Sequence, residues 1–136
     1  RSNGGLRVLF WNYTPPKTDE SDQVYFKRDL PSGNLGEVRV SVSGVPKGRY
    51  LMNVYRVGYG VNDVYTEYLK LGSPWSLTRE QVRGLAEHND GRSVGTARVV
   101  VTQSGNFSHS FAMRENDVYL VTLLPLKRAG SKTVPD

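Results

Sequence analysis

The chain has 136 residues and no cysteine, which excludes disulfides, thiolate catalysis and zinc sites built on cysteine. Its length predicts one domain with an ordinary hydrophobic core. The net charge is +5 at pH 7, but basic residues are scattered among acidic ones, so we expect no nucleic-acid partner. No apolar run approaches the roughly 20 residues of a membrane span, so we expect no membrane partner either. Localisation stays open.

The beginning of the chain predicts strands that end at turns. Residues 6–13 (LRVLFWNY) form a nearly continuous apolar run that stops at Thr14, Pro15 and Pro16, so we expect a strand buried on both faces. We expect Asn12 to fix the end of this strand through its amide. Residues 24–26 are expected to add a short strand after a polar loop.

Two later segments alternate between apolar and polar residues. In residues 37–43, Val38, Val40 and Val42 are expected to face the core while the intervening side chains face water. Residues 49–57 carry apolar side chains at both sets of alternating positions. This pattern predicts a central strand.

Residues 62–88 interrupt the strands with a predicted pair of short helices. Asn62 or Asp63 is placed to cap the first helix, and Gly72 is placed to end it. Thr78 and Gln81 form a capping box that starts the second helix. The expected apolar stripes are Tyr65, Tyr68, Leu69 and Leu71 on the first helix, and Val82, Leu85 and Ala86 on the second.

The last part of the chain again predicts strands, at residues 97–102, 106–113 and 117–124, with a hairpin turn at residues 114–116. Regular strands with turn signals predict an all-β fold, an antiparallel β-sandwich of the immunoglobulin or fibronectin type with an inserted helix pair. We expect residues 1–126 to form this domain and residues 127–136 to be a flexible basic tail or linker.

The sequence offers no catalytic constellation. Hydrolysis of a glycosidic bond needs two carboxyl groups about 5 Å apart or wider, whereas Glu115 and Asp117 flank the predicted hairpin and are expected to be solvated surface charges. His88 and His109 are isolated, so neither a metal site nor a nucleophile-base triad is expected. Gly58 and Gly60 are expected to form a bend. We therefore expect no catalytic, cofactor-binding or metal-binding residue, and no enzyme active on its own.

Short motifs along the chain occur in an order known from one enzyme family. They are Phe10-Trp11-Asn12-Tyr13, the turn residues Gly44, Pro46, Gly48 and Tyr50, the pair Tyr55-Arg56, and the helical positions Tyr65, Tyr68, Leu71, Gly72, Pro74, Thr78, Glu80 and Gln81. In this combination the chain resembles the C-terminal β-sandwich domain of glycoside hydrolase family 39, the family of β-xylosidases and α-L-iduronidases. The resemblance covers most of the chain. It implies a catalytic (β/α)8 barrel of about 250 residues that bears the acid and the nucleophile and is absent from this chain.

An aromatic surface on the helical segment is the candidate functional region, for domain docking or for sugar stacking. Its residues are Tyr59, Tyr65, Tyr68, Pro74 and Trp75, which are more than a small sandwich needs for its own core. We expect part of this surface to dock on the catalytic barrel of the same parent enzyme. Alternatively, the tyrosines simply cover one end of the sandwich. Burial of Trp75 would exclude docking through that side chain.

Three hypotheses of function remain. The favoured one is a non-catalytic accessory domain that packs on and stabilises the barrel of a family 39 glycosidase. The second is a carbohydrate-binding module, in which Trp11, Tyr59 or Trp75 stacks on sugar rings, although Trp11 lies in a strand expected to be buried. The third is a fibronectin-like protein-interaction domain, which predicts strands without the helix pair.

Overall fold

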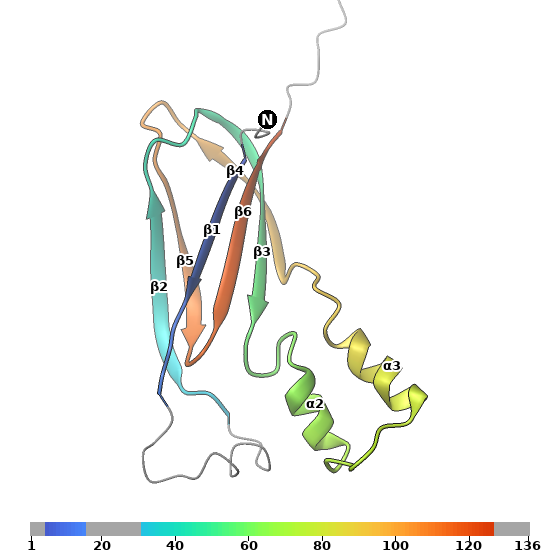
Figure 1. Cartoon of the computed structure of the whole chain (residues 1–136). Coiled ribbons are helices and arrows are strands. Elements are labelled where there is room, and N and C mark those ends of the chain that lie inside the picture. The colour runs from blue at the N-terminus through green and yellow to red at the C-terminus, as the bar shows by residue number, and fades with distance from the viewer. Residues whose placement is uncertain (1–4, 16–30, 127–136) are drawn as a thin grey trace, which may run out of the picture.

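Two antiparallel sheets and a pair of helices make up residues 5–15 and 31–126, the part of the chain that the computed structural model describes (Figure 1). The elements are β1 (Leu6–Trp11), β2 (Asn34–Val42), β3 (Gly48–Val57), α2 (Val64–Lys70), α3 (Arg79–Glu87), β4 (Gly95–Val101), β5 (Phe107–Arg114) and β6 (Val118–Pro125). The short strand predicted at residues 24–26 and the tail predicted at residues 127–136 lie outside the described residues.

The sheets confirm the predicted sandwich. One sheet has four strands in the order β1-β6-β3-β4, and the other pairs β2 with β5. Every pairing is antiparallel. The central position predicted for residues 49–57 is correct, because β3 lies between β6 and β4.

The core lies between the two sheets and is filled by alternate side chains. On β3 these are Tyr50, Met52 and Val54, which form one of its two alternating sets. The other buried members are Val45, Val101, Phe107, Phe111, Met113, Tyr119, Val121 and Leu123. From β2, Val40 and Val42 pack against this core, whereas Val38 is exposed. The two-stranded sheet covers only part of the four-stranded sheet.

The expectation that β1 is buried on both faces is wrong. Among the described strands, β1 pairs only with β6 and forms an edge of the four-stranded sheet. Its burial alternates, so that Leu6, Val8 and Phe10 are partly buried while Leu9 and Trp11 are exposed. Burial on both faces needs a packing layer on each side of the sheet, and here the second sheet supplies only one.

Both helices begin and end as predicted. Asp63 caps α2 by accepting a hydrogen bond from the Thr66 backbone N–H at 3.1 Å, and Gly72 follows the helix with a φ of 84°. At α3 the Thr78 hydroxyl and the Gln81 amide form the reciprocal capping box. Local side-chain chemistry therefore sets the bounds of the insertion.

The helix pair projects away from the two sheets (Figure 1). Among its helical residues, only Thr66 and Leu85 are buried. Val82 and Ala86, which we expected beside Leu85 in one apolar stripe, are exposed. The insertion therefore carries apolar side chains that its own packing leaves uncovered.

Candidate functional site

A buried ion pair lies where β3 leaves the sandwich toward the helices. The Arg56 guanidinium is 3.0 Å from the carboxylate of Asp117, which is fully buried and also accepts the Arg114 backbone N–H at 2.8 Å. The expectation that Asp117 is a solvated charge is therefore wrong. Its partner is 61 positions away in the sequence, so no local pattern announces the pair.

Tyr119 supports this ion pair from the core side. The Arg56 guanidinium lies over the Tyr119 ring at 5.8 Å from the centroid, and the Tyr119 hydroxyl donates to the Ala112 carbonyl at 2.6 Å. Burial raises the pKa of Tyr119, the Arg56 charge lowers it, and the Asp117 charge raises it. The phenol consequently stays neutral and acts as a hydrogen-bond donor and a packing surface.

The ion pair also dictates a glycine at the entrance to the helical segment. A Cβ atom on Gly58 would lie 1.9 Å from an oxygen of the Asp117 carboxylate. Any larger residue at this position would therefore have to displace the ion pair. Gly58 then bridges to Val61 in the bend that the sequence predicted, and the Asn62 side-chain amide donates to the Arg56 carbonyl at 2.8 Å. The start of the insertion is thus attached directly to the core.

The hairpin predicted at residues 114–116 is wrong, because β5 pairs with β2 while β6 pairs with β1 and β3, so this turn crosses from one sheet to the other. The β5–β6 turn joins two further segments at the same end of the sandwich. The Asn12 amide oxygen accepts from the Thr14 hydroxyl at 3.0 Å and from the Asn116 backbone N–H at 3.3 Å, which confirms its predicted role at the strand end. Glu115 is half-buried and accepts the Gly33 backbone N–H at 2.7 Å, so it is not the free surface charge we expected. This turn therefore holds the ends of β1, β2 and β3 together.

The five aromatic and proline residues singled out in the sequence form a row rather than one cluster. Tyr59 lies under the Arg114 guanidinium, at 5.6 Å from the ring centroid, and shares with Tyr65 the lining of a hollow of about 360 Å³. Tyr65 stacks on Tyr68 at 6.5 Å between centroids, and the Tyr68 hydroxyl donates to the Pro74 carbonyl at 3.0 Å. Trp75 is fully exposed in the loop between the helices. The condition that would have excluded docking through Trp75 is thus not met.

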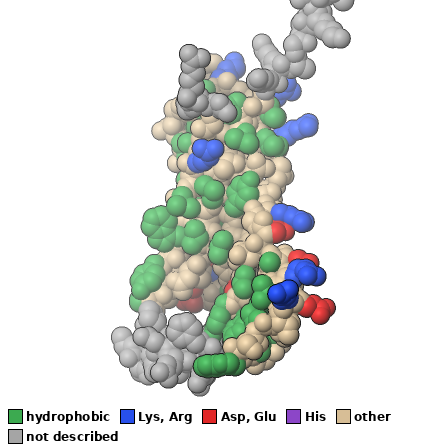
Figure 2. Space-filling view, turned by 45° about the vertical axis from the view of Figure 1, so that its right-hand side comes forward, with side chains coloured by type: hydrophobic (Ala, Val, Ile, Leu, Met, Phe, Trp, Pro, Cys, Tyr) green, Lys and Arg blue, Asp and Glu red, His purple; other side chains and the backbone are tan. Residues whose placement is uncertain are grey.

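A second apolar region was missed by sequence reasoning. Leu9 and Trp11 on β1, Val118 on β6 and Val57 on β3 are all exposed on the outer face of the four-stranded sheet. Figure 2 shows hydrophobic side chains gathered over the lower half of the sandwich and over the helix pair. No sequence signal separated this face from a core, because a continuous apolar run is equally typical of a strand covered on both sides.

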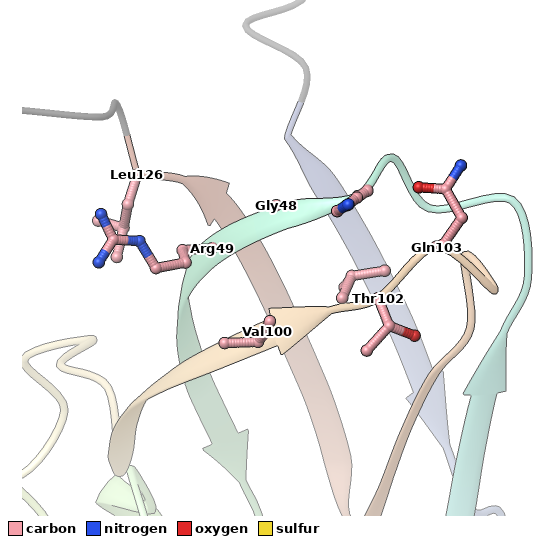
Figure 3. Close-up of a pocket in the computed structure, with 8 residues that line it drawn as sticks. Gly48, Arg49, Val100, Thr102, Gln103 and Leu126 are labelled. Carbon is pink, nitrogen blue, oxygen red and sulfur yellow. The ribbon is translucent and has the colours of Figure 1, made fainter.

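A larger cavity, of about 910 Å³, lies at the end of the sandwich opposite the helices. Figure 3 shows Arg49 and Leu126 on one side of it and Thr102 and Gln103 on the other. Within residues 5–15 and 31–126, its lining includes the cationic side chains of Lys47 and Arg49 but no carboxylate and no histidine. It therefore offers no acid-base pair for glycoside hydrolysis.

Among residues 5–15 and 31–126, no group of three or more potential metal ligands occurs. Within the same residues, neither helix has the length and apolarity to cross a membrane.

The fold and the site define the class: a β-sandwich domain with a protruding helix pair between its third and fourth strands. No family model matches the sequence, and no curated protein matches it significantly. Solved structures do match. The family 39 glycoside hydrolase from Xanthomonas axonopodis pv. citri is 27% identical with a TM-score of 0.83, over 93% of this chain and 25% of that one. A monomeric β-xylosidase from Caulobacter crescentus CB15 is 28% identical with a TM-score of 0.82, over the same shares.

A more distant match shares the fold alone. This is a bacterial orthologue of human α-L-iduronidase, 17% identical with a TM-score of 0.53, which covers 79% of this chain and 19% of that one. The chain spans about a quarter of the length of the two closer structures. These findings confirm the expected resemblance to the β-sandwich domain of family 39 glycoside hydrolases.

Proposed function

We propose that this chain is a non-catalytic accessory domain that packs on the catalytic barrel of a family 39 glycoside hydrolase and stabilises it. The observation that carries the proposal is the asymmetry of coverage: nearly all of this chain matches only a quarter of each enzyme. The two carboxylates beside the turn before β6 are also engaged by other groups, Asp117 by Arg56 and Glu115 by the Gly33 backbone N–H.

The protruding helix pair supports a docking role. Trp75 is fully exposed, and Tyr65, Leu71 and Val82 are also exposed on the insertion. Burying apolar surface stabilises a protein by about 25 cal/mol per Å², so a partner that covered these side chains would add stability that the isolated chain lacks. The candidate docking residues remain Tyr59, Tyr65, Tyr68, Pro74 and Trp75.

The ion pair gives this insertion a defined orientation. Arg56 is held by Asp117, and its carbonyl accepts from Asn62, one residue before the cap of α2. An element that is rigid before it binds loses less conformational entropy on binding. The buried pair thus suits a surface that must meet another domain in one geometry.

The parent enzyme is proposed to be of the β-xylosidase type, as the Caulobacter crescentus CB15 enzyme is, or of the α-L-iduronidase type that the sequence motifs also imply. The fibronectin-like alternative is less suitable, since it predicted strands without the helix pair that the structure contains.

Carbohydrate binding is the second candidate, and one observation favours it. Trp11 is 62% exposed on the outer face of the sheet, contrary to our expectation of burial, and an exposed indole can stack on a sugar ring. In the strand register, Trp11 lies opposite Val118 on β6, and Val118 lies opposite Val57 on β3. Sites for sugars need placed polar groups beside the aromatic ring, so these aliphatic neighbours favour a protein partner.

The test uses this chain and the catalytic barrel encoded in the same gene, produced as separate proteins. We expect addition of the chain to raise the thermal midpoint of the barrel and to lengthen its active half-life at elevated temperature. Serum albumin at equal mass is the control. Hydrolysis of a nitrophenyl glycoside by the chain alone, lost when one carboxylate is neutralised, would contradict the non-catalytic role. If the chain leaves the thermal midpoint and the active half-life of the barrel unchanged, the stabilising role is contradicted.

A further inference from the structure

Two rows of side chains cross the outer face of the four-stranded sheet beside the helix pair. The strand register places Trp11, Val118 and Val57 in one row, and Leu9, Leu120 and Tyr55 in the next. We call these six residues the sheet-face patch. Its outermost members are well exposed, with 58% for Leu9 and 52% for Val57. Contiguous apolar surface of this kind marks interaction sites in soluble domains.

The charge on the rest of this face has one sign. Beyond the patch, the outward positions of β1, β3 and β4 include Arg7, Arg49 and Arg98, and no outward position of the four described strands is acidic. A surface that fits this face is therefore apolar opposite the patch and acidic opposite the arginines. Two copies of the chain that met through this face would bring like charges together.

The patch continues into the helical segment. Val57 belongs to the patch and also lines the hollow of about 360 Å³, whose lining from the helical segment includes Asp63, Val64, Tyr65 and Asn89. The sheet face and the insertion thus form one surface with a recess at their junction. The recess can receive a protruding side chain of a partner.

We propose that the sheet-face patch and this hollow are the docking surface for the catalytic domain of the parent enzyme, whose matching surface is apolar with acidic side chains facing the arginines. This inference rests on the proposed accessory function and adds the face, its chemistry and its extent. The matched enzymes are about four times as long as the segment that this chain covers, so a domain of the same polypeptide is the available partner. Covalent linkage would hold it at high effective concentration.

The test again mixes this chain with the separately produced barrel of its own gene. The variants Trp11→Ser and Val57→Ser remove patch side chains. Val100→Ser is the matched control, because Val100 is 69% exposed and also faces outward from the same sheet, but lies on β4 outside the patch. Binding is measured by calorimetry, the bound face by hydrogen exchange, and the folding of each variant by its thermal midpoint.

We expect each patch variant to weaken binding about tenfold or more, while Val100→Ser binds as the parent chain does. Hydrogen exchange in the complex should slow in β1, β6 and the end of β3. Strong binding with protection confined to residues 64–87 would overturn this docking face and leave the accessory function standing. Absence of any complex would overturn both. Self-association abolished by Trp11→Ser, or xylo-oligosaccharide binding abolished by it, would replace the proposed partner by a second copy or by a sugar.

Discussion

Arg56 and Asp117 form an ion pair of 3.0 Å between the end of β3 and the residue that precedes β6. The carboxylate is fully buried, whereas the Arg56 side chain keeps a small contact with solvent. Removing one member of such a pair leaves an unpaired charge in a poorly solvated place, which costs more than the pair itself contributes. The pair also contacts the first residues of the helical insertion. Loss of the pair should therefore disturb the position of the insertion as well as the core.

Asp117→Asn should destabilise the fold by about 3 kcal/mol. The substitution keeps the shape of the side chain but leaves the Arg56 charge without its partner. Urea unfolding at neutral pH measures the change in the free energy of unfolding. Arg56→Gln and the double variant complete a cycle, in which the two single losses should not add. Additive losses below about 0.5 kcal/mol each would contradict a structural role of the pair.

Gly58→Ala should destabilise the chain by several kcal/mol, because its Cβ would lie 1.9 Å from an oxygen of the buried Asp117 carboxylate. Gly84→Ala is the control. Gly84 lies inside α3 with no atom within 4 Å of an added Cβ, so alanine there should stabilise the chain by roughly 0.5 to 1 kcal/mol. The prediction concerns the opposite signs of the two changes in thermal midpoint. It is wrong if both alanines behave alike.

Acidification should weaken the cap of α2 through Asp63. Partial burial raises the pKa of this carboxyl, but hydrogen bonds from the Thr66 hydroxyl and from the backbone N–H groups of Gly60 and Thr66 outweigh it and hold the pKa below its ordinary value. A lowered folded-state pKa means that the contribution to stability is present above the unfolded value and is lost as the pH falls through the folded value.

The variant Asp63→Asn separates this effect from general acid denaturation. Asparagine caps a helix about as well as aspartate but does not titrate. We therefore expect the parent chain to lose more stability than the variant between about pH 6 and about pH 3. Urea unfolding across this range measures the difference. If the free energy of unfolding falls with pH in the same way for both proteins, Asp63 has the same pKa in the folded and unfolded states, and the prediction is wrong.

Trp75→Ala should change the free energy of unfolding of the isolated chain by less than about 0.5 kcal/mol, because the indole is fully exposed. Tyr68→Phe should instead cost about 1 kcal/mol, since it removes the hydrogen bond to the Pro74 carbonyl. In the mixture with the barrel, only a docking role predicts that Trp75→Ala reduces the stabilisation of the barrel. Thermal midpoints of the chain and of the mixture give both readings.

Local chemistry made much of the fold predictable. The capping groups Asp63 and Thr78 and the Gly72 stop follow from contacts within a few residues, and all are where the sequence placed them. The turn before β6 is also in its predicted place, but it connects the two sheets and does not form a hairpin, because strand pairing depends on distant segments. The apolar side chains at both sets of alternating positions in residues 49–57 were equally informative, because they predicted the central strand that β3 is. The resemblance to family 39 came from such local motifs in order.

By itself, the sequence determined the class of fold and the helix pair with its caps. Only the tertiary structure decided that β1 is an edge strand, that Asp117 is buried against Arg56, and that Trp11 lies on an open face. The physical reason is the same in each case. Which side of an apolar strand stays open, and whether a charge finds a partner, depend on segments distant in the chain that meet only when the sheets assemble.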